Sequence, residues 1–166
     1  VHLCSFGEVP GDSDRVINAT AGVILLKALE AVGSQKLGGK TLLDLANPLD
    51  FSKGMPPTLT VCNTDSLGEQ IQRTYPSTKV VKGLNTLNCQ VMVAPEMVPG
   101  EHQVFICGND ADAKAVVNSL LHEMGWPASR ILDLGGIEAS RGTEMLMPFW
   151  ISLMGSLGTA VMNYKI

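Results

Sequence analysis

One segment, Thr41-Leu42-Leu43-Asp44-Leu45-Ala46-Asn47-Pro48, indicates the architecture of this chain most clearly. It is an apolar run that breaks into a turn, as a buried parallel strand does at its carboxyl end, and Pro48 stops it because proline supplies no ladder donor. In open α/β sheets, ligands bind at such carboxyl ends. Similar runs end in small polar residues at 16–20, 80–86 and 104–110. The pattern predicts a helix-covered parallel sheet with a ligand site at one edge.

Composition and charge narrow the class of protein. The 166 residues are 45% hydrophobic and 17% charged, with 5% aromatic residues, which excludes disorder and favours one compact domain with an aliphatic α/β core. A net charge of -4 with scattered lysines argues against nucleic acid as the principal partner, because that binding requires basic patches. The first residues lack a signal-peptide pattern, and the four cysteines are far apart. We therefore expect a cytoplasmic protein with reduced thiols and no metal site.

Strands and helices alternate along the chain. Strands are expected at 15–20, 40–46, 79–84 and 130–134, and in the apolar run that begins at Val104; helices are expected at 21–37, 66–73 and 111–124. Ser66 with Glu69 fits a capping box, and Asp110 fits an N-cap. The alternation predicts a parallel, right-handed βαβ sheet. The long loop 49–63 is either a ligand-covering segment or a surface excursion.

An uncharged segment at 145–162 is long enough to be considered as a membrane span. Pro148, Gly155 and Gly158 dilute its apolarity. We therefore expect a buried or interface helix, which makes a two-fold homodimer plausible. A membrane-associated domain is the alternative.

Motifs for common chemistries are missing or incomplete. No G-x-G-x-x-G occurs, and Gly39-Lys40-Thr41 lacks the first glycine of a phosphate loop and precedes a strand. Asp44, flanked by leucines, could be a base with a raised pKa, but a hydrogen-bonded structural aspartate is the preferred interpretation. Asn85 and Thr86 offer amide and hydroxyl groups without a titrating base. Such groups favour the orientation of a flat, neutral ring over acid–base catalysis.

Taken in order, five motifs resemble one family. They lie at 16–20, 43–48, 80–86, 107–114 and 132–136, the last followed by Ser140-Arg141. Together they are similar to the NADP oxidoreductases that depend on the deazaflavin coenzyme F420. The oxidoreductase domain of the transmembrane metalloreductases is similar too.

The resemblance implies a fold, a reaction and a site. The fold would be a partial NADP-binding Rossmann-like domain at 1–134, with a C-terminal helical region at 135–166 packed on it. The reaction would be hydride transfer between a nicotinamide and F420 or a flavin, with no catalytic side chain and no metal ligand. Residues bordering the nicotinamide and its ribose would be Thr20, Ala21, Ala46, Asn47 and Pro48. Residues on the deazaflavin side would be Asn85, Thr86, Gly135 and Arg141.

The chain departs from this family at its start. Family members open with a βαβ unit that carries the glycine-rich turn, and no such unit precedes Val1. We therefore expect an N-terminally truncated chain, a Rossmann-like sheet lacking its first βαβ unit, that binds NADP weakly or not at all by itself. The alternative is a non-enzymatic fragment or binding module of the same fold.

Overall fold

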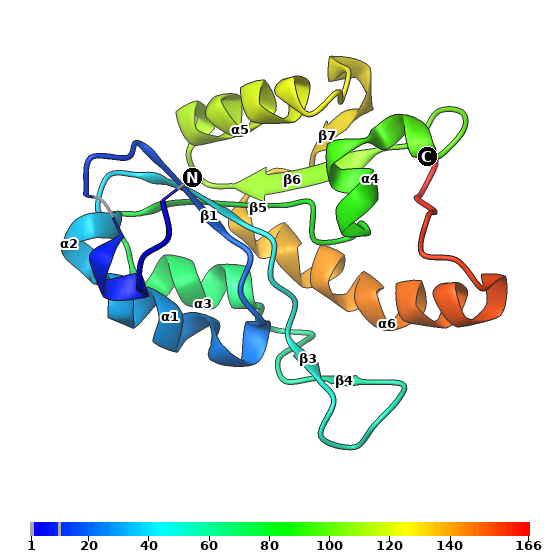
Figure 1. The fold of residues 1–166 in the computed structure, drawn as a ribbon, viewed down its shortest axis with the longest axis horizontal. Helices are drawn as coiled ribbons and strands as arrows, with labels where there is room; N and C mark the ends of the chain where they lie inside the picture. Colours follow the sequence, from blue (N-terminus) through cyan, green and yellow to red (C-terminus); the bar gives the residue numbers. More distant parts are fainter. Residues whose placement is uncertain (1, 10) are drawn as a thin grey trace.

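The computed structural model describes residues 2–9 and 11–166 and contains a five-stranded sheet at its centre (Figure 1). The strands stand in the order β1-β2-β5-β6-β7. Neighbours are parallel except β5 and β6, which are antiparallel. The predicted Rossmann-like fold is thus confirmed, but the sheet is mostly parallel where a parallel sheet was predicted, because β5 and β6 run in opposite directions. The strands are β1 (Arg15–Asn18), β2 (Thr41–Asp44), β5 (Lys79–Gly83), β6 (Val104–Gly108) and β7 (Ile131–Asp133).

The reversal of β6 follows from its connection to β5. Parallel neighbours need a crossover, usually a helix that lies along the sheet. Between β5 and β6 the chain forms only α4 (Cys89–Val93) and the 3-10 turn η3 (Pro95–Met97) before it returns. The carboxyl end of β6 therefore lies beside the amino end of β5, where Gly108 is the partner of Val81.

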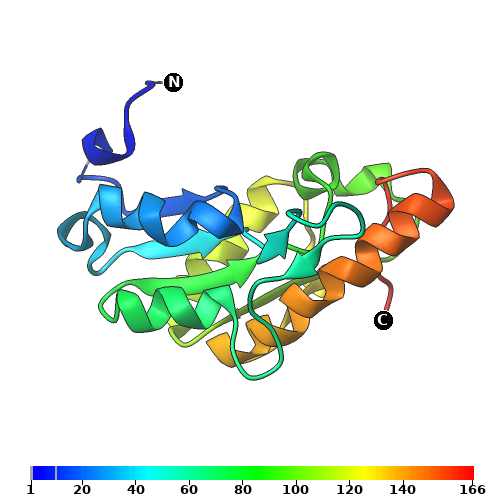
Figure 2. The same ribbon diagram turned by 90° about the horizontal axis from the view of Figure 1, so that it is seen from below.

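Helices cover both faces of the sheet (Figures 1 and 2). Alternate residues of a strand point to opposite faces. Leu42 and Val80 accordingly enter one core, under α1 (Leu25–Val32), α2 (Ser34–Leu37) and α3 (Leu67–Thr74). Leu43 and Val81 enter a second core under α4 and α5 (Ala111–Glu123). This alternation explains why the strands are apolar on both sides.

Both predicted helices begin at an N-cap, and at Ser66 the Glu69 carboxylate accepts from the hydroxyl, where a capping box would have it accept from the backbone amide. The Ser66 hydroxyl accepts a hydrogen bond from the Glu69 amide at 3.2 Å, which starts α3. The Asp110 carboxylate accepts one from the Ala113 amide at 2.8 Å, which starts α5. These caps satisfy amide groups that have no partner inside the helix.

The long helix expected at 21–37 is divided into three pieces. A 3-10 turn, η2 (Gly22–Ile24), precedes α1, and α2 follows after a break. Gly33 lies at the break with φ of 91°, in the region that glycine tolerates best. The sequence pattern did not predict this break.

The strand expected in the core at 130–134 lies at the edge instead. Among the residues that the structure describes, β7 pairs only with β6, and Leu132 and Leu134 are 39% and 40% exposed. After β7 the chain passes through η5 (Ile137–Ala139) into α6 (Ser140–Leu157). Two further 3-10 turns are η1 (Phe6–Glu8) and η4 (Ala128–Arg130).

α6 is the C-terminal helix that the sequence predicted. Its residues Met147, Trp150 and Ile151 form a small separate core, which includes Leu49 and Tyr164. Within residues 2–9 and 11–166, no helix has the length and apolarity needed to cross a membrane. The boundary at residue 134, the homodimer and the cytoplasmic location stay predictions.

The expected loop at 49–63 contains a short hairpin. Two-residue strands, β3 (Leu49–Asp50) and β4 (Thr58–Leu59), pair in antiparallel fashion. The hairpin projects away from the sheet (Figure 1). Its role as a ligand cover stays a prediction.

Candidate functional site at the strand ends

Three polar residues stand side by side where β1, β2 and β5 end. Asn18 is the register partner of Asp44, and Asp44 is the register partner of Lys82. Asp44 and Lys82 lie two residues after Leu42 and Val80, so their side chains point to the same face, the one covered by α1 and α3. The sheet thus places an amide, a carboxylate and an ammonium group in one row.

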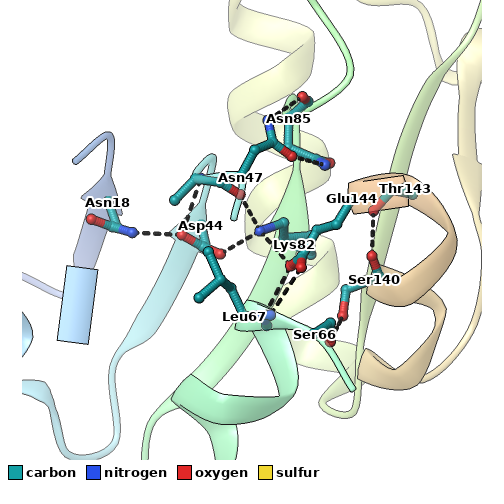
Figure 3. A network of polar contacts seen from close by, with 12 residues as sticks. Asn18, Asp44, Asn47, Ser66, Leu67, Lys82, Asn85, Ser140, Thr143 and Glu144 are labelled. Atoms are coloured by element: carbon teal, nitrogen blue, oxygen red, sulfur yellow. Dashed lines mark hydrogen bonds and ion pairs between the residues drawn. The ribbon is translucent and has the colours of Figure 1, made fainter. Parts of the chain in front are cut away.

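The row is completed by Glu144 from α6 (Figure 3). The Lys82 Nζ lies 2.7 Å from Oδ2 of Asp44 and 2.9 Å from Oε1 of Glu144. All three side chains are at most 1% exposed. Glu144 also accepts hydrogen bonds from the backbone amides of Leu67 at 2.9 Å and Gly68 at 3.1 Å. A buried carboxylate at the amino end of α3 is favourable because that end carries partial positive charge.

The ammonium group of Lys82 keeps its charge despite this burial. Desolvation by itself would lower the pKa of Lys82, because burial disfavours the charged form. The adjacent carboxylates of Asp44 and Glu144 outweigh that effect and hold the pKa above its ordinary value. The Asp44 carboxylate is thus paired and hydrogen-bonded, as the preferred interpretation expects, and its structural role stays a prediction.

Asp44 also connects β2 to the turn that follows β1. Its Oδ1 accepts hydrogen bonds from the Asn18 side chain at 2.5 Å and from the Ala46 amide at 3.2 Å. The Asn18 oxygen in turn accepts from the Thr20 hydroxyl at 2.7 Å and from the Thr20 amide at 3.3 Å. Lys82 donates a further hydrogen bond to the Ala46 carbonyl. The segments after β1 and β2 therefore share one polar network.

Two asparagines connect the ends of β2 and β5. The side-chain amide of Asn47 donates to the backbone carbonyl of Asn85 at 2.7 Å. The side-chain amide of Asn85 donates to Oδ1 of Asn47 at 2.9 Å. Leu84, just before Asn85, has φ of 62°. A buried leucine in this region is strained, and such strain is concentrated at functional sites.

The turn after β1 packs closely against the same segment. A Cβ atom at Gly22 would lie 2.0 Å from the carbonyl oxygen of Asn47. Only glycine permits this approach of one backbone to another. The turns after β1 and β2 are therefore in direct contact.

Most residues that the sequence proposed for the site come together at this edge. Thr20 and Ala21 follow β1, Ala46, Asn47 and Pro48 follow β2, and Asn85 and Thr86 follow β5. Asn85 is 2% exposed and Thr86 is 1% exposed. These seven residues form one group.

Gly135 and Arg141 lie outside that group. The Gly135 carbonyl accepts a hydrogen bond from the Gly108 amide at 3.0 Å, at the carboxyl end of β6 and hence at the opposite end of β5. The Arg141 guanidinium is engaged by Glu69 on α3, with Nε to Oε2 at 2.8 Å and Nη2 to Oε1 at 2.5 Å. The hydrogen bonds from Arg141 hold the pKa of Glu69 below its usual value. The antiparallel direction of β6 explains the position of Gly135.

Sequence reasoning missed Asn18, Lys82 and Glu144. A signal for Lys82 was present, because Asp44 and Lys82 each lie among apolar residues near a strand end, and buried charges need partners. Glu144 is the last charged residue before an uncharged run. No local pattern indicated that α6 would bring it to Lys82.

The chemistry of this edge suits a flat ring more than a phosphate chain. Its uncharged polar groups are amides, hydroxyls and backbone atoms, of which those of Thr20 and Asn47 are partly buried and those of Asn85 and Thr86 are buried, while Lys82, Asp44 and Glu144 are already paired. The sequence contains no G-x-G-x-x-G turn to hold a pyrophosphate. Among the described residues, no group of three or more histidines, cysteines or acidic residues could hold a metal ion. The residues therefore fit the nicotinamide half of a dinucleotide.

A hollow of about 610 Å³ lies at the opposite end of the sheet. It is lined in part by Arg15, Lys40 and Lys79. Lys40 donates to backbone carbonyls, and Lys79 lies 3.1 Å from Asp110. Lys40 and Lys79 thus have partners, and the hollow is remote from the strand ends that hold Asn47 and Asn85.

Comparison with known proteins agrees with this geometry. No family model matches the chain. A crystal structure from Arthrobacter sp. FB24, provisionally named an F420-dependent NADP reductase, is 55% identical with a TM-score of 0.95, over 99% of this chain and 74% of that one. The F420-dependent NADP reductase of Methanocaldococcus jannaschii is 30% identical over 120 residues, 72% of this chain and 52% of that protein. Metalloreductase STEAP3 of Rattus norvegicus is 28% identical over 136 residues, 79% of this chain and 26% of that protein.

The fold and the strand-end site define a Rossmann-like α/β domain with a C-terminal helix. Within that class, the chain belongs to the family of F420-dependent NADP reductases. The predicted resemblance is confirmed. The chain spans about half of the archaeal relative and about a quarter of the rat relative.

Proposed function

We propose that this chain forms the ring-binding part of an NADP-linked oxidoreductase, which transfers a hydride between a nicotinamide and coenzyme F420 or a flavin. The observation that carries the proposal is the meeting of three strand ends. The network of Asp44 connects β1 to β2, and the pair of Asn47 and Asn85 connects β2 to β5. The names of the relatives support the same reaction.

The chain's residues would hold and orient the two rings. When bound, the dihydronicotinamide supplies a hydride, which the deazaflavin accepts together with a proton from water. Asn47 and Asn85 carry amide groups that do not titrate, so they position rings without moving protons. The nicotinamide and its ribose would border Thr20, Ala21, Ala46, Asn47 and Pro48, and the second ring would border Asn85 and Thr86.

Absorbance-monitored hydride exchange tests the proposal. The chain is mixed with F420 and either NADPH or reduced nicotinamide mononucleotide, and the loss of the reduced-nicotinamide band is followed. Because the sequence has no glycine-rich phosphate turn, we expect the two donors to react at comparable rates. Flavin mononucleotide in place of F420 identifies the second ring. Absence of exchange with both acceptors would contradict the proposal.

A pair of variants separates the site from the scaffold. Asn85→Ala removes the amide that donates to Asn47, and we expect the exchange rate to fall by about tenfold, as for loss of one orienting hydrogen bond. Asn118→Ala is the control, because Asn118 lies on α5. Its rate should match that of the unmodified chain. Equal rates for both variants would remove Asn85 from the site.

A further inference from the structure

We propose that Lys82 and Glu144 are positioning residues for the nicotinamide half of this site. They hold the turns after β1 and β2 in the geometry that hydride transfer requires, although neither would touch the ring. The inference rests on the proposed function and extends it to residues in the layer beneath the strand ends.

The contacts of Lys82 lead directly to the proposed ring-binding segment (Figure 3). Its ammonium group donates to the Ala46 carbonyl and to Oδ2 of Asp44. The other oxygen of Asp44 accepts from the Ala46 amide. Lys82 thus holds the carbonyl of Ala46 directly, and its partner Asp44 holds the amide of the same residue, immediately before Asn47.

The same network reaches the turn after β1. Oδ1 of Asp44 accepts from the Asn18 side chain, and Asn18 accepts two hydrogen bonds from Thr20. A displacement of Lys82 would therefore pass through Asp44 and Asn18 to Thr20. Thr20 and Ala46 are the first residues of the two segments that would border the nicotinamide.

Glu144 fixes Lys82 from the other side. Its carboxylate is held by the backbone amides of Leu67 and Gly68 at the start of α3, so it cannot move without that helix. With Asp44 it places the ammonium group between two carboxylates 2.7 and 2.9 Å away. A buried ion network is weak evidence for stability, because apolar residues of similar volume are often as good. This network ends on strand-end backbone groups, which points to a role in orientation.

Steady-state hydride transfer by Lys82→Met is the first test. Misplacement of reacting groups by about 1 Å can cost about 100-fold in rate, so we expect kcat to fall by about that factor. KM should stay within about threefold, because a ring that is bound but misaligned loses rate more than affinity. Lys79→Met is the matched control, since Lys79 lies on the same strand and pairs with Asp110 at the opposite end. An unchanged kcat in Lys82→Met would overturn the inference.

Asn18→Ala keeps the inference testable if Lys82→Met does not fold. This variant removes only the last connection, and Asp44 keeps Lys82 and the Ala46 amide as partners. We expect kcat to fall by about tenfold, because the variant removes the hydrogen bond from Asn18 to the Asp44 carboxylate and the two hydrogen bonds that Thr20 donates to Asn18. Unchanged kcat in folded Asn18→Ala would count against the network.

Amide hydrogen exchange gives a readout that needs no cofactor. The Thr20 amide donates to Asn18, and the Ala46 amide donates to Asp44. Exchange should become at least about tenfold faster at both amides in Lys82→Met, and at the Thr20 amide in Asn18→Ala. The Gly108 amide, bonded to Gly135 at the other end, should keep its rate. If the unmodified chain shows no hydride transfer, the proposed function fails, and exchange alone decides the positioning role. Unchanged exchange at Thr20 and Ala46 would overturn it.

Discussion

The two ends of strand β5 carry the same kind of ion pair in opposite surroundings. At the amino end, Lys79 lies 3.1 Å from Asp110, and their side chains are 38% and 33% exposed. Near the carboxyl end, Lys82 lies 2.7 Å from Asp44, and neither side chain is exposed. Water solvates the first pair and screens it, whereas the second pair depends wholly on protein groups.

This difference in burial means that water can replace the first ion pair, whereas the second holds neighbouring protein groups in place. If the ion pair between Lys79 and Asp110 were broken, water would solvate both side chains. Lys82 is surrounded by Asp44, Glu144 and the Ala46 carbonyl, so its removal leaves buried carboxylates without a cation. The end of the sheet with buried charges is also the end where the proposed site lies.

The largest expected effect on stability is that of Lys82→Met. Breaking a buried ion network by removing one partner costs about 3–5 kcal/mol, so the free energy of unfolding should fall by that amount. Lys79→Met should lower it by less than about 1 kcal/mol, as for a surface pair. Urea unfolding of both variants measures the difference. Equal losses would show that burial does not distinguish the two ends.

Loss of a helix cap should also cost more stability at the end of the sheet with the buried charges than at the opposite end. Ser66→Ala at the start of α3 should cost about 2 kcal/mol, because it removes a cap and a buried partner of Ser140. Asp110→Ala at the start of α5 should cost about 1 kcal/mol, since water can replace that cap. Thermal unfolding compares them. A larger loss for Asp110→Ala would contradict the comparison.

Deprotonation of Lys82 should lower the stability of the folded chain at alkaline pH. Its pKa is raised in the folded chain, so the folded state holds this proton more tightly than the unfolded state. Stability from this group is complete below the unfolded pKa of about 10.4 and is lost as pH rises through the folded pKa. The melting temperature should therefore fall above about pH 10 in the unmodified chain. If Lys82→Met shows the same alkaline fall, another group is responsible.

The smallest effect concerns thiol labelling and leaves stability unchanged. Cys107, the register partner of Lys82 on β6, is buried, and desolvation raises the pKa of its thiol to about 12. Cys89 is exposed. A maleimide at neutral pH should label Cys89 quickly and Cys107 only after unfolding. Peptide mass spectrometry reads both sites, and rapid labelling of Cys107 in the folded chain would contradict its burial.

Particular elements show how far the sequence could be interpreted. The caps at Ser66 and Asp110 were predictable, because they depend on residues only three positions apart. The direction of β6 was not, since an apolar strand has the same pattern in either direction. The edge position of β7 was hidden for a similar reason: strand order depends on the whole sheet.

In the proposed site too, the sequence indicated some residues correctly, whereas the positions of others depended on the fold. Thr20, Asn47 and Asn85 are polar residues that follow apolar runs, so the sequence indicated them as strand-end residues. The structure brings these residues together. Gly135 was grouped with them by family resemblance, but it lies beside Gly108. Arg141 was expected to face the deazaflavin, and its guanidinium is engaged by Glu69, which lies 72 residues earlier in the chain.

By itself, the sequence determined the strands, the two buried faces and the polar residues at the strand ends, because these depend on local periodicity and on residues a few positions apart. Only the tertiary structure decided which of those residues meet. Lys82 and Asp44 are 38 residues apart, and Glu144 reaches them from the C-terminal helix. Contacts of this length depend on strand order, strand direction and helix packing, and the low dielectric of the closed core then makes the charges depend on one another.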